Sequence, residues 1–260
     1  MAQLLDILPC QLDDWCNICG GIGINLASAV IELIIGVLAI TLGILLKQSA
    51  KKSFFSNGSN RFIAMASRLN VTESNDFRGQ GRTFAGAAIP DYEIVALRNF
   101  SRLLNFDDTS LRDLPWTKKI MFLRFPSLSI EASPNKVITN ENDIPSATTI
   151  FSIGSPGYNT VSEYVENIAN LAKFINGNSA IYLDTQSSSN NPFLIQRVRR
   201  SEGGYYFYLA GCTIEGSSQA VKNLLLHWKS YKKRFKKNDF AILFEIRNGV
   251  ATEVKVVVRS

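Results

Sequence analysis

Two glycine-rich turns contain the residues whose types and spacing are best suited to bind an anion. The first reads Gly154-Ser155-Pro156-Gly157-Tyr158-Asn159, and the second runs from Ala210 to Ser218. Each turn follows a β-rich stretch and precedes a helical pattern, so backbone N–H groups at the helix start would point at a bound phosphate. Neither turn matches the dinucleotide fingerprint or the P-loop, so each is weak evidence alone. The candidate ligand-binding residues in these turns are Gly154, Ser155, Gly157, Asn159, Gly211, Gly216 and Ser217.

A third segment, SNDFRGQGRTFAG at residues 74–86, places Arg78 and Arg82 among glycines. Guanidinium groups and the N–H groups of a glycine loop can together hold an anion. The same composition is typical of a polar linker, which is the simpler interpretation. We retain Arg78 and Arg82 as candidate ligand-binding residues.

Catalytic groups are harder to assemble from this sequence. His227 is the only histidine, and it falls inside a predicted helix, so a Ser-His or Cys-His mechanism is not expected. Glu215, beside the second turn, is the best candidate for a general acid or base, although a solvated turn carboxylate is the more frequent outcome. Cys16 and Cys19 lack a second cysteine pair and a nearby histidine, so no metal site is predicted. Other candidate groups around the same crevice are Asp184, Cys212, Asn159 and Ser217.

The two turns need a sheet to hold them, and β-rich runs alternate with helical patterns over the second half of the chain. This alternation predicts a three-layer, Rossmann-like α/β domain over residues 90–260, with both turns at the carboxyl ends of strands and flanking one crevice. Asn248-Gly249 predicts a C-terminal β-hairpin. The predicted strands are Thr148–Ile153, Ser179–Leu183, Phe193–Val198, Tyr205–Leu209, Phe240–Ile246 and Glu253–Val258. An amphipathic helix is predicted after each turn, the first with Ile175 on its apolar face and the second beginning near Ser217.

The preceding stretch gives weaker patterns. Residues 47–89 are predicted to form a juxtamembrane linker and Gly/Arg loop, with one short helix at Arg61–Asn70. Helical spacing of apolar residues begins after Pro90, a residue that suits the first turn of a helix. Lys118–Phe125 is predicted to be a strand, and residues 126–147, with three prolines, are predicted to be a loop.

The N-terminal region contains an apolar run, IGINLASAVIELIIGVLAITLGILL, at residues 22–46. About 20 apolar residues suffice to cross a bilayer as a helix, so a single transmembrane helix is predicted. The run follows an acidic flank and precedes Lys47, Lys51 and Lys52, the reverse of a signal peptide. Basic residues favour the cytoplasmic side, so residues 1–21 are expected outside and the α/β domain in the cytoplasm.

Glu32 lies inside this apolar run and would be costly if it faced lipid. At helical spacing it shares a face with small and polar residues, a pattern that lets helices of neighbouring subunits approach closely. This predicts a homo-oligomer with Glu32 at the subunit interface. The alternative is a helix boundary at Glu32, which would leave Leu33–Leu46, a short span. The residues of the predicted transmembrane seam are Asn25, Ala29, Glu32, Gly36, Ala39 and Gly43.

Charge is unevenly distributed along the chain. The net charge is +6, yet residues 1–46 hold four acids and no Lys or Arg. The remainder is therefore strongly basic and could attract anionic ligands or lipid headgroups, or simply present a solvated basic surface. Lys232–Lys237 is the densest basic cluster, and compensation of a helix C-terminus is its simplest explanation.

Taken as a set, several motifs resemble a recurrent bacterial soluble domain of Rossmann-like fold with no settled activity, over roughly residues 70–245. They are Asn75–Arg82 with Phe84-Ala85-Gly86, Gly154–Asn159 with Ser162, and Ala210-Gly211 with Gly216, Ser217 and Ala220. A single-pass anchor joined to such a domain is also similar in architecture to membrane effectors of bacterial anti-phage defence. These resemblances imply a location in the bacterial inner membrane and an effector role in antiviral defence.

The leading hypothesis is a membrane-anchored sensor or effector. Its α/β domain would bind an anionic, nucleotide-like ligand or a regulatory protein, and its oligomeric helix would then disrupt the bilayer. No cofactor is assigned beyond this possible ligand, and nucleic acid is not the expected partner. The alternatives are a membrane-tethered enzyme acting on a nucleotide or glycosyl substrate and a structural protein that only docks a partner.

Overall fold

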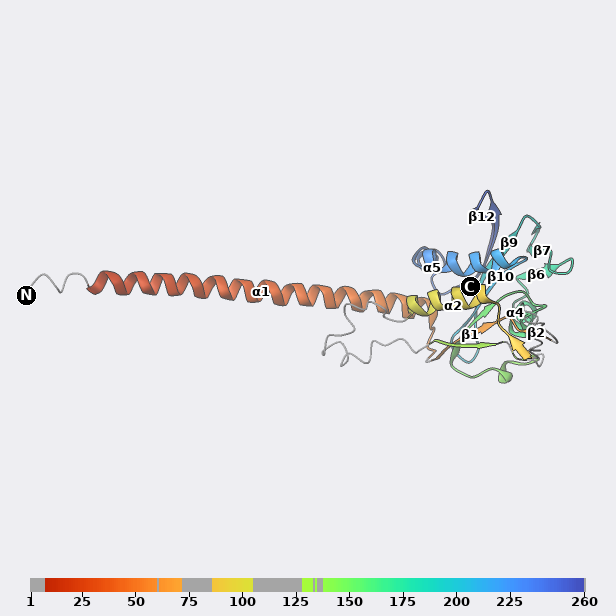
Figure 1. Cartoon of the computed structure of the whole chain (residues 1–260), viewed down its shortest axis with the longest axis horizontal. Coiled ribbons are helices and arrows are strands. Elements are labelled where there is room, and N and C mark those ends of the chain that lie inside the picture. Colours follow the sequence, from red (N-terminus) through yellow and green to blue (C-terminus); the bar gives the residue numbers. More distant parts are fainter. Residues whose placement is uncertain are drawn as a thin grey trace, which may run out of the picture. The chain divides into compact units, whose positions relative to one another are not determined.

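A computed structural model describes residues 8–59, 61–71, 86–104, 128–132, 134 and 138–259 (Figure 1). The predicted strand at Lys118–Phe125 and the arginines Arg78 and Arg82 lie outside these residues. The chain divides into two compact units, one up to Ser49 and the other from Ala50 to Ser260.

The first unit consists of most of helix α1, Leu8–Phe55. The segment Ser28–Phe55 of α1, whose last residues belong to the second unit, is long and apolar enough to cross a membrane. Its most apolar stretch has a mean hydropathy of 2.7 and none of its residues is buried. This confirms an N-terminal apolar helix of membrane-spanning length, whereas the membrane and the orientation stay predictions. The helix runs past the expected end at Leu46 because no Gly or Pro interrupts it before Asn57 and Gly58, both at positive φ.

The second unit is built around a seven-stranded mixed sheet in the order β12-β11-β9-β10-β5-β1-β4. The pairings place β4, β1, β5, β10 and β11 in one direction, and β9 and β12 in the other. The mixed α/β class is therefore confirmed, and the Rossmann-like description stays a prediction. The strands are β1 Arg61–Ala66, β4 Leu128–Ala132, β5 Thr148–Ile153, β9 Pro192–Arg199, β10 Tyr205–Gly211, β11 Asp239–Arg247 and β12 Val250–Arg259.

Both faces of this sheet are covered. Side chains alternate between the faces, as strand geometry requires: Phe207 of β10 points to one core and Tyr206 and Tyr208 to the other. The first core contains α2 (Asp91–Leu104), α5 (Ile214–Phe235) and the last turn of α1, and α2 lies against α5 (Figure 1). The second contains α4 (Thr160–Ala169) and the small sheet of β6 (Ala172–Ile175), β7 (Ala180–Leu183) and β8 (Gln186–Ser188).

The predicted helix at Arg61–Asn70 is wrong. The segment forms β1, which lies between β5 and β4, followed by β2 (Leu69–Val71), which pairs with β3 (Gly86–Ala88). Five of the six β1 residues are buried, and a strand buried on both faces reads as a continuous apolar run without a strand period. The compact α/β unit therefore begins at Ala50 rather than at residue 90.

Several element ends also differ from the expectations. The helix after the first turn ends at Ala169, because Asn170 adopts a left-handed conformation, and the following residues form β6. Helix α5 begins at Ile214, ahead of the expected start near Ser217. The expected loop at residues 126–147 contains the edge strand β4 and the 3-10 helix η3, Glu141–Asp143.

The predicted hairpin is confirmed, because β11 and β12 pair in antiparallel fashion around Asn248 and Gly249. The two turn residues have φ values of +53° and +75°. Positive φ at both central positions is what a two-residue hairpin turn of type I′ requires. The turn chemistry is local, and for this reason the sequence alone predicts it.

The last turn of α1 is part of the domain core. Phe54 and Phe55 are fully buried, and the Phe55 ring centroid lies 5.4 Å from that of Phe207 and 5.9 Å from that of Trp228. The Thr149 hydroxyl donates to the Phe55 carbonyl at 2.9 Å. A carbonyl group that a helix end leaves unpaired therefore finds its partner on the sheet.

We expect Phe55→Ala to lower the free energy of unfolding of the α/β unit by about 3–5 kcal/mol, because it leaves a cavity among packed rings. Leu226→Ala on α5 is the control, since Leu226 is 67% exposed, and it should change stability by no more than about 0.5 kcal/mol. Denaturant unfolding of the full chain in detergent, followed by tryptophan fluorescence, measures both. Equal losses in the two variants would contradict the assignment of the helix end to the core.

Candidate functional site

The connections that leave β1 and β5 diverge to opposite faces of the sheet. These two strands are parallel neighbours, yet the chain after β1 leads to α2 in the first core and the chain after β5 leads to α4 in the second. In open α/β sheets, ligands bind beyond the carboxyl ends of the strands at such a divergence. This directs attention to Ser67 and Arg68 after β1 and to the turn Gly154–Asn159 after β5.

Asn159 fixes the geometry of the first glycine turn. Its Oδ1 accepts hydrogen bonds from the N–H groups of Val161 and Ser162, at 3.0 and 3.3 Å, and so caps α4. Its Nδ2 donates to the carbonyls of Met65 and Ile153, at 2.9 and 2.8 Å. One side chain, only 1% exposed, therefore ties the ends of β1 and β5 to the start of α4.

Within this turn, position 154 accepts only glycine. Its φ is +98°, and a Cβ there would lie 2.0 Å from the Ser67 hydroxyl oxygen and 3.1 Å from a Glu93 carboxylate oxygen. Both the backbone conformation and the close approach of the β1 end therefore require a residue without a side chain.

Glu93 is a buried carboxylate behind the turn. It is fully buried and accepts hydrogen bonds from the Ser67 N–H at 2.6 Å and from the Tyr92 hydroxyl at 3.3 Å. Burial raises the pKa of this carboxyl group, and the hydrogen bonds from Ser67 oppose the rise. Glu93 thus joins the start of α2 to the end of β1, a role that its position in the sequence did not indicate.

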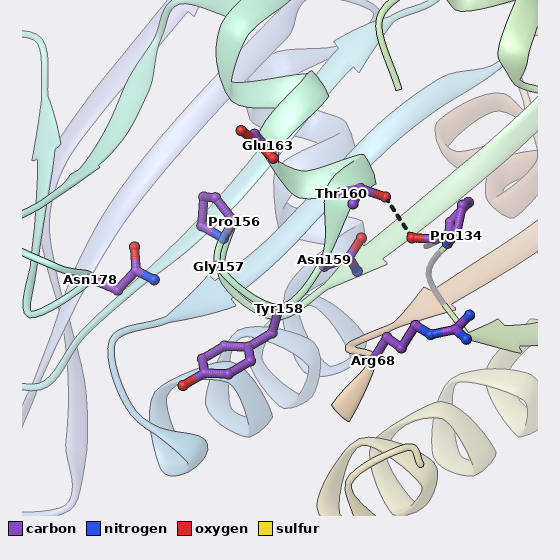
Figure 2. Close-up of a pocket in the computed structure, with 9 residues that line it drawn as sticks. All are labelled: Arg68, Pro134, Pro156, Gly157, Tyr158, Asn159, Thr160, Glu163 and Asn178. Carbon is purple, nitrogen blue, oxygen red and sulfur yellow. Dashed lines mark hydrogen bonds between the residues drawn. The ribbon is translucent and has the colours of Figure 1, made fainter. Parts of the chain in front are cut away.

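A pocket of about 370 Å³ opens at this point. In Figure 2, Arg68 and Asn178 lie on opposite sides of the turn, with Tyr158 between them and Glu163 on the first turn of α4. The Arg68 N–H donates to the Tyr158 carbonyl at 2.8 Å. The residues that line the pocket are Arg68, Pro134, Pro156, Gly157, Tyr158, Asn159, Thr160, Glu163 and Asn178.

The pocket combines four kinds of chemical group. Arg68 supplies a guanidinium, Glu163 an exposed carboxylate, Asn178 an amide, and Tyr158 a ring that is 57% exposed. The positive end of the α4 dipole and the Arg68 cation favour an anionic group. The lining also contains the opposite charge of Glu163, so it is not uniformly cationic.

Of the candidate ligand-binding residues in the first turn, Gly157 and Asn159 line the pocket. Gly154 and Ser155 are buried within the turn itself. Arg68, Tyr158, Glu163 and Asn178 were not among the candidates. Arg68 was missed because the strand before it was interpreted as a helix, which concealed its position at a carboxyl strand end.

The second glycine turn lies beyond the neighbouring strand and serves packing. A Cβ on Gly211 would come within 2.4 Å of the Gly216 carbonyl carbon, so β10 and the first turn of α5 approach at backbone distance. The Ser217 hydroxyl accepts a hydrogen bond from the Gly211 N–H at 3.0 Å, and Thr213 caps the helix. Since β5 and β10 are parallel neighbours, the two turns lie at the same end of the sheet, beyond the carboxyl ends of these strands. The helices that follow them, α4 and α5, pack on opposite faces of the sheet.

Of the catalytic candidates, Asn159 lines the described pocket, whereas Glu215, Asp184, Cys212 and Ser217 do not. Glu215 is exposed and accepts a hydrogen bond from Asn191 at 3.2 Å. Burial raises the pKa of the Cys212 thiol to about 12, which keeps it protonated. Asp184 forms an ion pair with Lys255 at 3.2 Å. Among the residues that the structure describes, no three His, Cys, Asp or Glu side chains are placed to hold a metal ion.

The predicted transmembrane seam lies on α1. Ala29, Glu32, Gly36, Ala39 and Gly43 are all exposed in the single chain, and Asn25 belongs to the same helix. A Cβ added at Gly36 or Gly43 would have no neighbour within 4 Å. The surface is therefore open for another helix to pack on, and the oligomer stays a prediction.

We expect Gly154→Ala to destabilise the unit by about 1–3 kcal/mol more than Gly58→Ala. Both glycines have positive φ, but a Cβ at Gly58 meets nothing within 4 Å, whereas one at Gly154 would lie 2.0 Å from the Ser67 hydroxyl oxygen and displace it. The pair of variants therefore isolates crowding from backbone strain. Thermal unfolding of the two purified chains measures the difference, and equal midpoints would show that the turn is not tightly packed against β1.

The remaining question is what this chain is similar to. Comparison with protein-family models, with curated proteins and with solved structures finds no match.

Proposed function

We propose that this protein is a membrane-anchored sensor or effector whose α/β unit binds a nucleotide-like ligand in the pocket at the ends of β1 and β5. The single observation that carries this proposal is the position of the pocket, at the divergence of two parallel strands and beside the start of α4. Its volume of about 370 Å³ suits a small molecule. The Rossmann-like description of the unit belongs to the same proposal.

The lining side chains suggest how such a ligand would lie. A phosphate group would approach Arg68 and the first turn of α4, where a guanidinium and a helix dipole both favour negative charge. The ring of a base would pack on the exposed face of Tyr158. Sugar hydroxyl groups would donate to Glu163 and bond the amide of Asn178.

The apolar helix supplies the second half of the proposal. Helix α1 crosses a bacterial inner membrane with its N-terminus outside, and the face that carries Glu32 and Gly36 packs against sister copies. Occupation of the pocket changes the packing of the subunits, and the helices pass the change to the bilayer or disrupt it. A regulatory protein that competes with the ligand and a role in anti-phage defence are consistent with this architecture.

We expect the full chain in nanodiscs to bind one member of a nucleotide panel saturably and without turnover. Arg68→Gln should weaken binding at least about tenfold through loss of a charge-assisted hydrogen bond. Isothermal titration calorimetry measures the affinity, and chromatography of the incubated nucleotide measures turnover.

Arg98→Gln is the matched control, because Arg98 is exposed on α2 and does not line the pocket. Turnover of a nucleotide or a glycosyl substrate would favour the membrane-tethered enzyme. An affinity of Arg68→Gln equal to that of the wild type, with Tyr158→Ala also unchanged, would exclude this pocket as the binding site.

We expect Gly36→Leu and Glu32→Leu to reduce the number of subunits per assembly while leaving ligand binding intact, because each obstructs the small and polar face of α1. Ile35→Leu, which alters a different face of the same helix, is the control. Single-molecule photobleaching in supported bilayers counts the subunits. A wild-type chain that is monomeric in the bilayer would contradict the seam.

A further inference from the structure

The C-terminal part of α5 has a buried apolar face and an exposed basic face. Trp228, Tyr231 and Phe235 are buried and belong to the first core. The lysines around them turn outward, and all but the half-buried Lys232 are exposed. We call this group the α5 basic surface, and it consists of Lys229, Lys232, Lys233, Lys236 and Lys237.

The charge of this surface exceeds what the fold requires. A helix C-terminus is equivalent to roughly half an elementary negative charge, which one or two cations compensate. Arg234, in the same stretch, is already paired with Glu253 at 2.6 and 2.9 Å. None of the ion pairs in the described part of the chain involves the five lysines.

The α5 basic surface lies next to the end of α1. The Arg197 guanidinium donates both to the Phe54 carbonyl at 3.4 Å and to the Lys236 carbonyl at 2.9 Å, so one planar group bridges the two segments. The ring centroids of Phe54 and Trp228 are 6.3 Å apart. The lysines are therefore held where the chain enters the α/β unit from the apolar helix.

The length of chain between the apolar run and Phe55 is short. If Leu46 ends the hydrocarbon region, the helical segment Lys47–Phe55 extends roughly 14 Å at most. The headgroup region occupies about 5–7 Å of this distance. What remains is within the Debye length of about 10 Å at 0.1 M salt, and a lysine side chain extends farther toward the surface.

We propose that the α5 basic surface binds the anionic phospholipid headgroups of the bilayer that holds α1. The inference rests on the proposed membrane anchorage. It adds a second, electrostatic contact with the membrane, which attracts clustered lysines when anionic lipid is present. Nucleic acid shares the phosphate chemistry, but the short chain to the bilayer favours lipid as the partner.

The test measures the reactivity of individual lysines in the full chain. The protein is placed in nanodiscs of phosphatidylcholine alone or with phosphatidylglycerol, acetylated in a short pulse, and analysed by mass spectrometry. We expect the acetylation rates of Lys233, Lys236 and Lys237 to fall about threefold or more in the anionic nanodiscs at low salt, and to recover at high salt. Lys222, exposed on the same helix, and Lys173, exposed on β6, are the controls and should not change.

Each other outcome overturns the proposal in a recognisable way. Equal rates in both nanodiscs, from a chain that is fully incorporated, would exclude the lipid contact and leave the proposed anchor intact. Failure of the chain to enter neutral nanodiscs would remove the anchor and the lipid contact together. Protection by added RNA or DNA without protection by phosphatidylglycerol would assign the surface to nucleic acid.

Discussion

The structure of the α/β unit depends on the burial of the last turn of α1 in the first core. Phe54 and Phe55 occupy the centre of an aromatic cluster, with the Arg197 guanidinium 4.8 Å from the Phe54 ring centroid and 4.7 Å from that of Tyr205. Arg197 is fully buried, and desolvation lowers its pKa to about 10, so it stays charged at neutral pH. No buried carboxylate is bonded to this cation in the described part of the chain. Backbone carbonyls near two helix ends and the faces of aromatic rings stabilise it instead.

This arrangement explains why the α/β unit begins at Ala50 rather than after a flexible linker. Residues of the expected linker instead provide two core aromatic side chains, Phe54 and Phe55, and the strand β1 between β5 and β4. Removing them would leave β5 without one neighbour and α5 without part of its packing surface. A cation that contacts three segments of the chain also makes the end of α1 sensitive to any rearrangement of α5 and β9.

The candidate site depends on the same strand. The end of β1 supplies Arg68 to the pocket, the Met65 carbonyl to Asn159, and the Ser67 N–H to Glu93. Glu93 and Asn159 are buried and bonded to backbone, so they position the turn. The side chains of Arg68, Tyr158, Glu163 and Asn178 also line the pocket, and the proposed ligand would contact them.

The sequence by itself determined the features that depend on neighbours within one element. The apolar helix, the helix after Pro90, the hairpin at Asn248-Gly249 and the strand–glycine–helix order around Gly154 follow from local periodicity and turn chemistry. These were enough to predict a mixed α/β fold and to place one glycine turn at the candidate site.

Only the tertiary structure decided that β1 lies inside the sheet, between β5 and β4, and which side chains meet at its carboxyl end. A strand that is buried on both faces shows no alternation of apolar and polar residues. The sequence of β1 was therefore compatible with a helix, and the position of Arg68 after a strand was not recognised. The same holds for the bond between Glu93 and the Ser67 N–H, and for the close approach of Gly211 to Gly216. In each case the contact joins residues that are distant in the sequence or lie on different elements, so the local sequence pattern does not predict it.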